Sequence, residues 1–108
     1  MSSILRDVKH TLGVDPEDRT FDTELCLHIN AALAIVQQIG LPVEPRVVDD
    51  LLEWENLYIG THLDNIREIV SLHCRLTFDP SQYSFVTSAL EKILEEAKVR
   101  LSYSLEVQ

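Results

Sequence analysis

The chain has 108 residues and a mass of 12.3 kDa, which is the size of one domain with enough core to fold independently. Hydrophobic residues make up 45% and charged residues 25%, a globular composition that excludes a disordered or collagen-like chain. Eighteen acidic residues against nine basic ones give a formal net charge of -9, which disfavours non-specific binding to a nucleic-acid backbone.

The first residues of the chain do not form a basic segment followed by an apolar one, and the apolar runs elsewhere are short. We therefore expect neither a signal peptide nor a membrane span, and a soluble protein made in the cytoplasm. Cys26 and Cys74 are 48 positions apart in apolar segments, which favours reduced, buried thiols over a disulfide.

Two helices are predicted in the first part of the chain. Residues 3–12 carry apolar side chains at helical spacing and are followed by Gly13, a residue typical of a helix end. A second helix, capped by Thr20 or Asp22, is predicted to run to about Ile39 and to end at Gly40. Its apolar face is wide enough that part of it is available to a second subunit. The face consists of Leu25, Leu27, Ile29, Ala31, Ala32, Leu33, Ala34, Ile35, Val36 and Ile39.

Residues 41–58 are predicted to form a structured excursion between the longer helices. Pro42 and Pro45 interrupt regular structure at its start, and the rest is compatible with a strand or a short helix. Trp54 is the only tryptophan. Its large apolar area makes it either the anchor of the excursion in the core or an interface hot spot.

The second half of the chain predicts two more helices. One runs from Leu63 to Phe78, ends at Asp79-Pro80 and should be the central helix. The other runs from about Ser84 to Leu101, and Lys92, Glu96 and Arg100 are spaced for ion pairs along its outer face. The residues that we expect it to bury are Val86, Leu90, Ile93, Leu94, Ala97 and Leu101.

The last residues alternate in polarity, with Tyr103, Leu105 and Val107 on one side. This pattern predicts either an extended tail that adds as a strand to another protein or a helix end that frays into disorder. The expected organisation is thus a helical domain over residues 1–101 and an extended C-terminal tail over 102–108. The fold class is all-α, a small bundle of about four helices.

No catalytic or metal site is readable in the sequence. Cys26, His28, His73 and Cys74 are the nominal zinc ligands, but two residues apart on a helix diverge by about 200° and adjacent ones by about 100°. The three glycines are isolated, and no nucleophile has a base and an orienting group in a recognisable motif. We therefore expect neither an enzyme nor a bound cofactor.

Arg67 and Arg75 are the residues on which a helix-turn-helix DNA reader would depend. They lie eight apart on similar azimuths of one helix, but acidic neighbours surround them and no basic stripe is formed. A mixed-charge surface or intersubunit ion pairs therefore explain them better than DNA reading.

Considered together, several segments resemble the head-to-tail connector, or adaptor, proteins of long-tailed bacteriophages and prophages. The resemblance covers nearly the whole chain and is carried by Leu12-Gly13-Val14-Asp15, Phe21-Asp22-Thr23-Glu24-Leu25, His28-Ile29-Asn30-Ala31-Ala32-Leu33, Ile39-Gly40, Trp54, Arg75-Leu76-Thr77-Phe78-Asp79-Pro80, Leu90-Glu91 and Arg100-Leu101.

This resemblance implies a virion structural protein in the neck between head and tail. It implies a homo-oligomeric ring of twelve copies under the portal protein, through which DNA passes without sequence-specific binding, and a platform for the stopper or tail-completion protein. On this interpretation Tyr103, Leu105 and Val107 form a portal-binding tail. The competing class is a small cytoplasmic helical regulatory or interaction module, which could be dimeric.

Overall fold

A computed structural model describes residues 3–78 and 83–106 of the chain. It contains the helices α1 (Ile4–Leu12), α2 (Asp22–Ile39), α3 (Trp54–Leu57), α4 (Leu63–Phe78) and α5 (Ser84–Glu106). The described residues form no strand beyond an isolated bridge between Ser3 and Glu53. The predicted all-α small bundle is therefore confirmed, and α4 has the predicted bounds.

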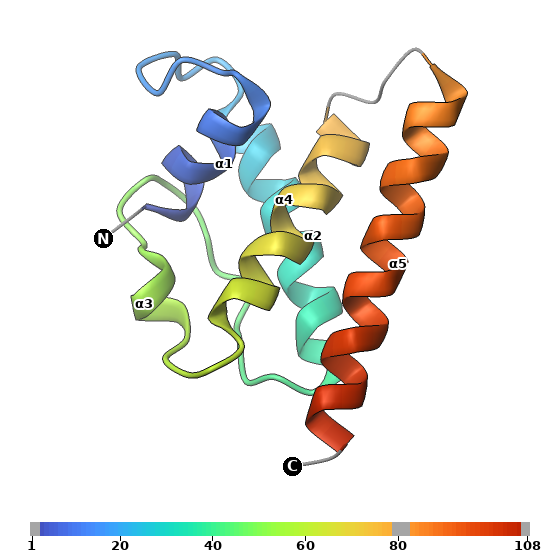
Figure 1. Cartoon of the computed structure of the whole chain (residues 1–108). Helices are drawn as coiled ribbons and strands as arrows, with labels where there is room; N and C mark the ends of the chain where they lie inside the picture. Colours follow the sequence, from blue (N-terminus) through green and yellow to red (C-terminus); the bar gives the residue numbers. More distant parts are fainter. Residues whose placement is uncertain (1–2, 79–82, 107–108) are drawn as a thin grey trace.

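Helix α4 is the central element of the bundle, as the sequence predicts. It packs against α1, α2 and α5, while α1 and α5 each also contact α2 (Figure 1). The four residues of α4 that are buried, Ile66, Ile69, Val70 and Cys74, follow the 3–4 spacing of one helix face. Helix α5 lies at one edge of the molecule, so one of its faces has no neighbouring helix among the described residues (Figure 1).

Both predicted glycine stops end a helix. Gly13 follows α1 with φ at 76°, and Gly40 follows α2 with φ at 136°. In each case the backbone N–H of the glycine donates to carbonyls of the preceding turn, which satisfies acceptors that the helix itself leaves free.

We expect Gly13→Val to lower the free energy of unfolding by about 1–2 kcal/mol, because a side chain with a Cβ is disfavoured at this φ. Nothing lies within 4 Å of the position that a Cβ would occupy, so the loss would come from the backbone and not from a clash. Gly13→Asn should lose clearly less, since asparagine tolerates the left-handed region. Equal urea midpoints for the wild type and the valine variant would contradict this expectation.

The predicted cap of α2 is wrong. The N-cap position is Phe21, which makes no side-chain cap hydrogen bond, and α2 begins at Asp22 itself. Neither Thr20 nor Asp22 caps the helix, because the Asp22 carboxylate pairs with Lys9 and Arg19 instead. The chain leaves part of the predicted apolar face uncovered: Leu27 is 66% exposed and Ala31 is exposed as well.

The excursion contains no strand. Residues 41–53 are irregular but held in place, with Leu41, Val43 and Val47 buried in the core. The short helix α3 follows and begins with a capping box between Glu53 and Asn56. Trp54 is 1% exposed, so it is the core anchor, and the interface alternative does not fit this structure.

The prediction of an extended tail is wrong for residues 102–106. These residues continue α5 to Glu106 without a break at Leu101. Leu105 lies four residues after the buried Leu101 and therefore on the same helix face, where it packs against the core. A Cβ added at Gly40 would lie 3.3 Å from Cδ1 of Leu105. Tyr103 is exposed, and Val107 lies outside the described residues.

Helix α5 buries fewer residues than predicted. Leu94, Ala97 and Leu101 are buried, but Val86 and Leu90 are only half-buried and Ile93 is 42% exposed. The reason is that α5 packs on the bundle with one narrow face, mainly against α4 and α2.

Candidate functional site

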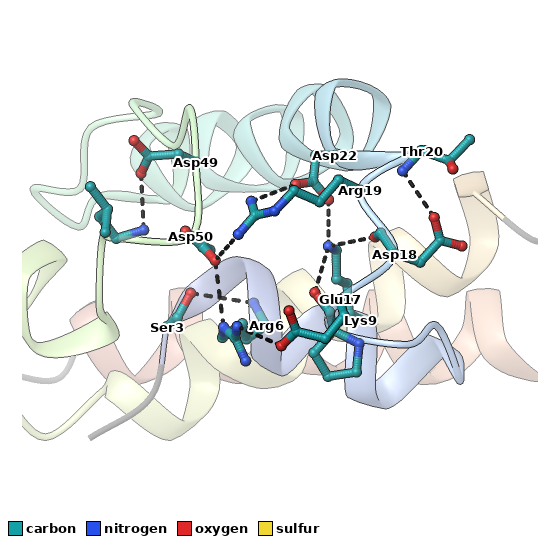
Figure 2. A network of polar contacts seen from close by, with 12 residues as sticks. Ser3, Arg6, Lys9, Glu17, Asp18, Arg19, Thr20, Asp22, Asp49 and Asp50 are labelled. Atoms are coloured by element: carbon teal, nitrogen blue, oxygen red, sulfur yellow. Dashed lines mark hydrogen bonds and ion pairs between the residues drawn. The ribbon is translucent and has the colours of Figure 1, made fainter.

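A network of charged side chains joins α1, the turn before α2 and the end of the excursion (Figure 2). At its centre is Lys9, which is 1% exposed. Its ammonium donates to the backbone carbonyls of Pro16 and Asp18 at 3.3 and 2.9 Å and pairs with Oδ1 of Asp22. The buried ammonium is thus hydrogen-bonded to two carbonyls and paired with a carboxylate, as burial of a charge requires. The lysine fixes the turn at residues 14–21 to both helices.

Asp50 is the second centre of this network and holds the excursion against α1 and the turn before α2 (Figure 2). Its Oδ2 lies 3.0 Å from Arg19 and 3.5 Å from Arg6. Partial burial alone would raise the pKa of this carboxyl, but the hydrogen bond from Arg19 and the two guanidinium charges outweigh it and hold the pKa below its ordinary value.

A third polar contact places Arg67, one of the two predicted interface arginines. Oδ2 of Asp7 accepts a hydrogen bond from Nε1 of Trp54 and another from Arg67, each at 3.0 Å. The Arg67 guanidinium also lies 5.7 Å from the centre of the indole ring. Arg67 is therefore engaged within its own chain, where it joins α4 to α1 and α3.

Arg75 differs from Arg67. It is exposed near the end of α4, and no described carboxylate lies within 4.0 Å of it.

The ion pairs predicted along α5 are also absent among the described side chains: Arg100 binds Glu68 of α4 at 2.8 Å, and Lys98 binds Glu95. Lys92 has no described carboxylate within 4.0 Å either.

The nominal zinc ligands do not form a metal site in the described part of the chain. His28 is 3.8 Å from Glu24 and makes an edge contact with the ring of Phe78, while Cys74 is fully buried. Burial, followed by the nearby His28 and Lys98, lowers the pKa of His73. Within residues 3–78 and 83–106, no group of three or more His, Cys, Asp or Glu side chains is arranged to hold a metal ion.

We expect neither thiol to react with a small disulfide reagent in the native protein at about pH 8. Burial raises the pKa of Cys74 to about 12, and burial together with Asp22 and Asp49 raises that of Cys26. Both thiols should react completely in denaturant, which serves as the control. Rapid modification of Cys74 in the native state would contradict its placement in the core.

Two apolar surfaces remain exposed on different parts of the molecule. One, which we call the excursion ridge, is formed by Leu27 of α2 with Val48 and Leu51 of the excursion, which are 66%, 81% and 79% exposed. Open hollows of about 280 and 250 Å³ lie on either side of Val48. The other is the outer face of α5, where Phe85 and Val99 are 72% and 65% exposed. An open hollow of about 520 Å³ lies there, lined by Lys92, Glu95, Glu96, Val99 and Arg100.

These features define a small helical protein whose distinctive surfaces are apolar contact surfaces. Its charged clusters connect helices to one another, and none of those described combines a nucleophile with a base. No described helix is long and apolar enough to cross a membrane.

The phage connector protein family has a model that matches residues 4–108, nearly the whole chain, and the protein belongs to this family. The membership agrees with the resemblance in the sequence and supports a structural role at the junction of phage head and tail. Comparison with curated proteins and with solved structures found no match.

Proposed function

We propose that the protein is a head-to-tail connector subunit that forms a ring under the portal and extends the DNA channel in the virion neck. The observation that carries this proposal is the match of the phage connector family over residues 4–108. The ring then provides the platform on which the stopper or the tail-completion protein docks. The twelvefold symmetry is the number that the resemblance in the sequence implies.

The physical properties of the chain support a passive channel role. The principal extents of 42 × 35 × 19 Å describe a flat subunit, a shape that packs side by side around an axis. A net charge of -9 repels phosphates, so DNA would slide past such a ring without being held.

The portal contact is assigned to the C-terminal end of α5. Tyr103 is exposed there, whereas Leu105 faces the core, so of these two predicted contact residues Tyr103 is the one free to meet the portal. Arg75, which has no described carboxylate partner, is the better of the two arginines for an intersubunit ion pair.

The experiment is a native mass measurement of the purified protein, alone and mixed with the portal protein from the same genome. A closed ring, formed alone or only on the portal, is the expected result. A small species that ignores the portal would overturn the proposal. A salt-dependent affinity of a dimer for DNA would instead favour the regulatory module.

A further inference from the structure

The excursion ridge is held rigidly although its backbone is irregular. The side-chain amide of Asn30 donates to the carbonyl of Val47 at 2.9 Å and accepts from its N–H at 2.8 Å, so one side chain pairs both backbone groups. Val47 is buried. Because neighbouring side chains of an extended segment point to opposite sides, Val48 must point outward, and it is 81% exposed.

The far end of the ridge is fixed as well. Oδ1 of Asp49 accepts from the N–H of Leu51, Asp50 is bound by Arg6 and Arg19, and the carbonyl of Leu52 accepts from Ile4 at 3.0 Å. Val48 and Leu51 are thus presented between two fixed points. Holding exposed apolar side chains in one position is what a docking surface needs, since little entropy remains to be lost on binding.

The outer face of α5 has a regular pattern of its own. Phe85, Lys92 and Val99 recur at seven-residue intervals, and so do Ala89, Glu96 and Tyr103. Seven residues are close to two turns, so both sets form one stripe along the helix. The described residues of this stripe are all exposed. It is an apolar contact stripe with one cation and one anion near its middle.

The two surfaces complement each other in charge. On α5, neither Lys92 nor Glu96 has a described ion-pair partner within 4.0 Å. The hollow beside Val48 is lined by Asp49, which likewise forms no ion pair there, and by Arg46, whose nearest carboxylate, Glu44, is 3.9 Å away. Lys92 can therefore face Asp49, and Glu96 can face Arg46.

The positions of the surfaces also suit a contact between copies. Leu27 lies about 200° around α2 from the buried Leu25, so the ridge is on the side of α2 opposite to the core face against which α4 and α5 pack. Two different surfaces of one subunit can form a head-to-tail contact between copies, which closes into a ring when the rotation per subunit allows it.

We propose that the excursion ridge of one copy docks on the outer face of α5 of the next copy, with Val48 and Leu51 seated beside Val99 and Asp49 paired with Lys92. This inference rests on the proposed ring and assigns the two surfaces that build it. It also gives a role to Leu27, the part of the α2 face that the chain leaves uncovered.

Charge reversal tests the contact. Lys92→Asp and Asp49→Lys should each weaken assembly, alone or on the portal, by about tenfold, and combining them should restore most of the loss because the pair is re-formed with opposite signs. Glu91→Lys is the matched control, since Glu91 is exposed on α5 but lies outside the stripe. If assemblies form and both reversals behave like the control, the inference is wrong and the connector role stands. If the wild type forms no assembly even with the portal, both fail.

Cross-linking gives a second measurement that does not depend on charge. In a Val48→Cys/Val99→Cys variant, oxidation of the assembly should yield a ladder of covalent oligomers, while either single variant should stay monomeric. The native thiols are buried and should not interfere. Covalent dimers of Val99→Cys alone would show that α5 pairs with α5 of another copy, which overturns the head-to-tail contact.

Discussion

Replacing Lys9 with methionine is expected to lower the free energy of unfolding by about 3 kcal/mol, the low end of the range for breaking a buried ion pair. Methionine keeps the apolar stem of the side chain but removes the ammonium. The carbonyls of Pro16 and Asp18 lose their donor, and the buried Oδ1 of Asp22 loses its partner. Urea denaturation followed by helical circular dichroism measures the change.

Lys98→Met is the matched control for this prediction. Its ammonium is 2.7 Å from Glu95, but the carboxylate is largely exposed, and we expect a change within about 0.5 kcal/mol. Adding Asp22→Leu to Lys9→Met should recover part of the loss, because the buried Oδ1 that lost Lys9 is then removed. Equal free energies of unfolding for Lys9→Met and Lys98→Met would show that the buried contacts of Lys9 do not stabilise the fold.

Trp54→Ala is expected to cost about 3–5 kcal/mol, the range for removing a buried aromatic side chain. The indole is 1% exposed, and its loss leaves a cavity where α1, α3 and α4 meet. Trp54→Phe should cost about 1–2 kcal/mol, since most of the apolar area stays and mainly the hydrogen bond to Asp7 is lost.

The control for the tryptophan variants is Leu51→Ala, which removes apolar area from a side chain that is 79% exposed. Its free energy of unfolding should stay within about 0.5 kcal/mol of the wild type. The unfolding of all three variants must be followed by circular dichroism, because two of them lack the only tryptophan fluorophore. A small loss for Trp54→Ala would mean that the indole does not anchor the excursion.

The glycine stops of α1 and α2 and the bounds of α4 were the most predictable part of the fold. Gly13 and Gly40 mark stops because few other residues adopt positive φ, and Leu63–Phe78 is bounded by signals that act locally. The end of α5 was mispredicted because alternation over a few residues does not exclude a helix. Leu101 and Leu105 are four residues apart, which is a helical spacing. Leu101 is buried in the core and Leu105 packs against it, so the helix continues to Glu106.

The hydrogen bonds that Lys9 and Asn30 make inside the fold were not predicted, because both residues are of polar types that usually lie at the surface. Lys9 lies four residues after the buried Leu5, and Asn30 four after the buried Cys26, so both sit where a helix faces its neighbours. This four-residue spacing from a buried residue was the signal in the sequence that Lys9 and Asn30 face the interior. Its meaning depends on which backbone groups come to lie opposite, and this is a property of tertiary structure that local patterns do not contain.

The two ends of the excursion ridge respond differently to solution conditions. At Val47 the segment is held by the neutral amide of Asn30, a contact that neither salt nor protonation weakens much. At Asp50 it is held by exposed guanidinium groups, whose attraction concentrated salt screens. Rising ionic strength should therefore loosen the Leu51 end of the ridge while Val48 keeps its place.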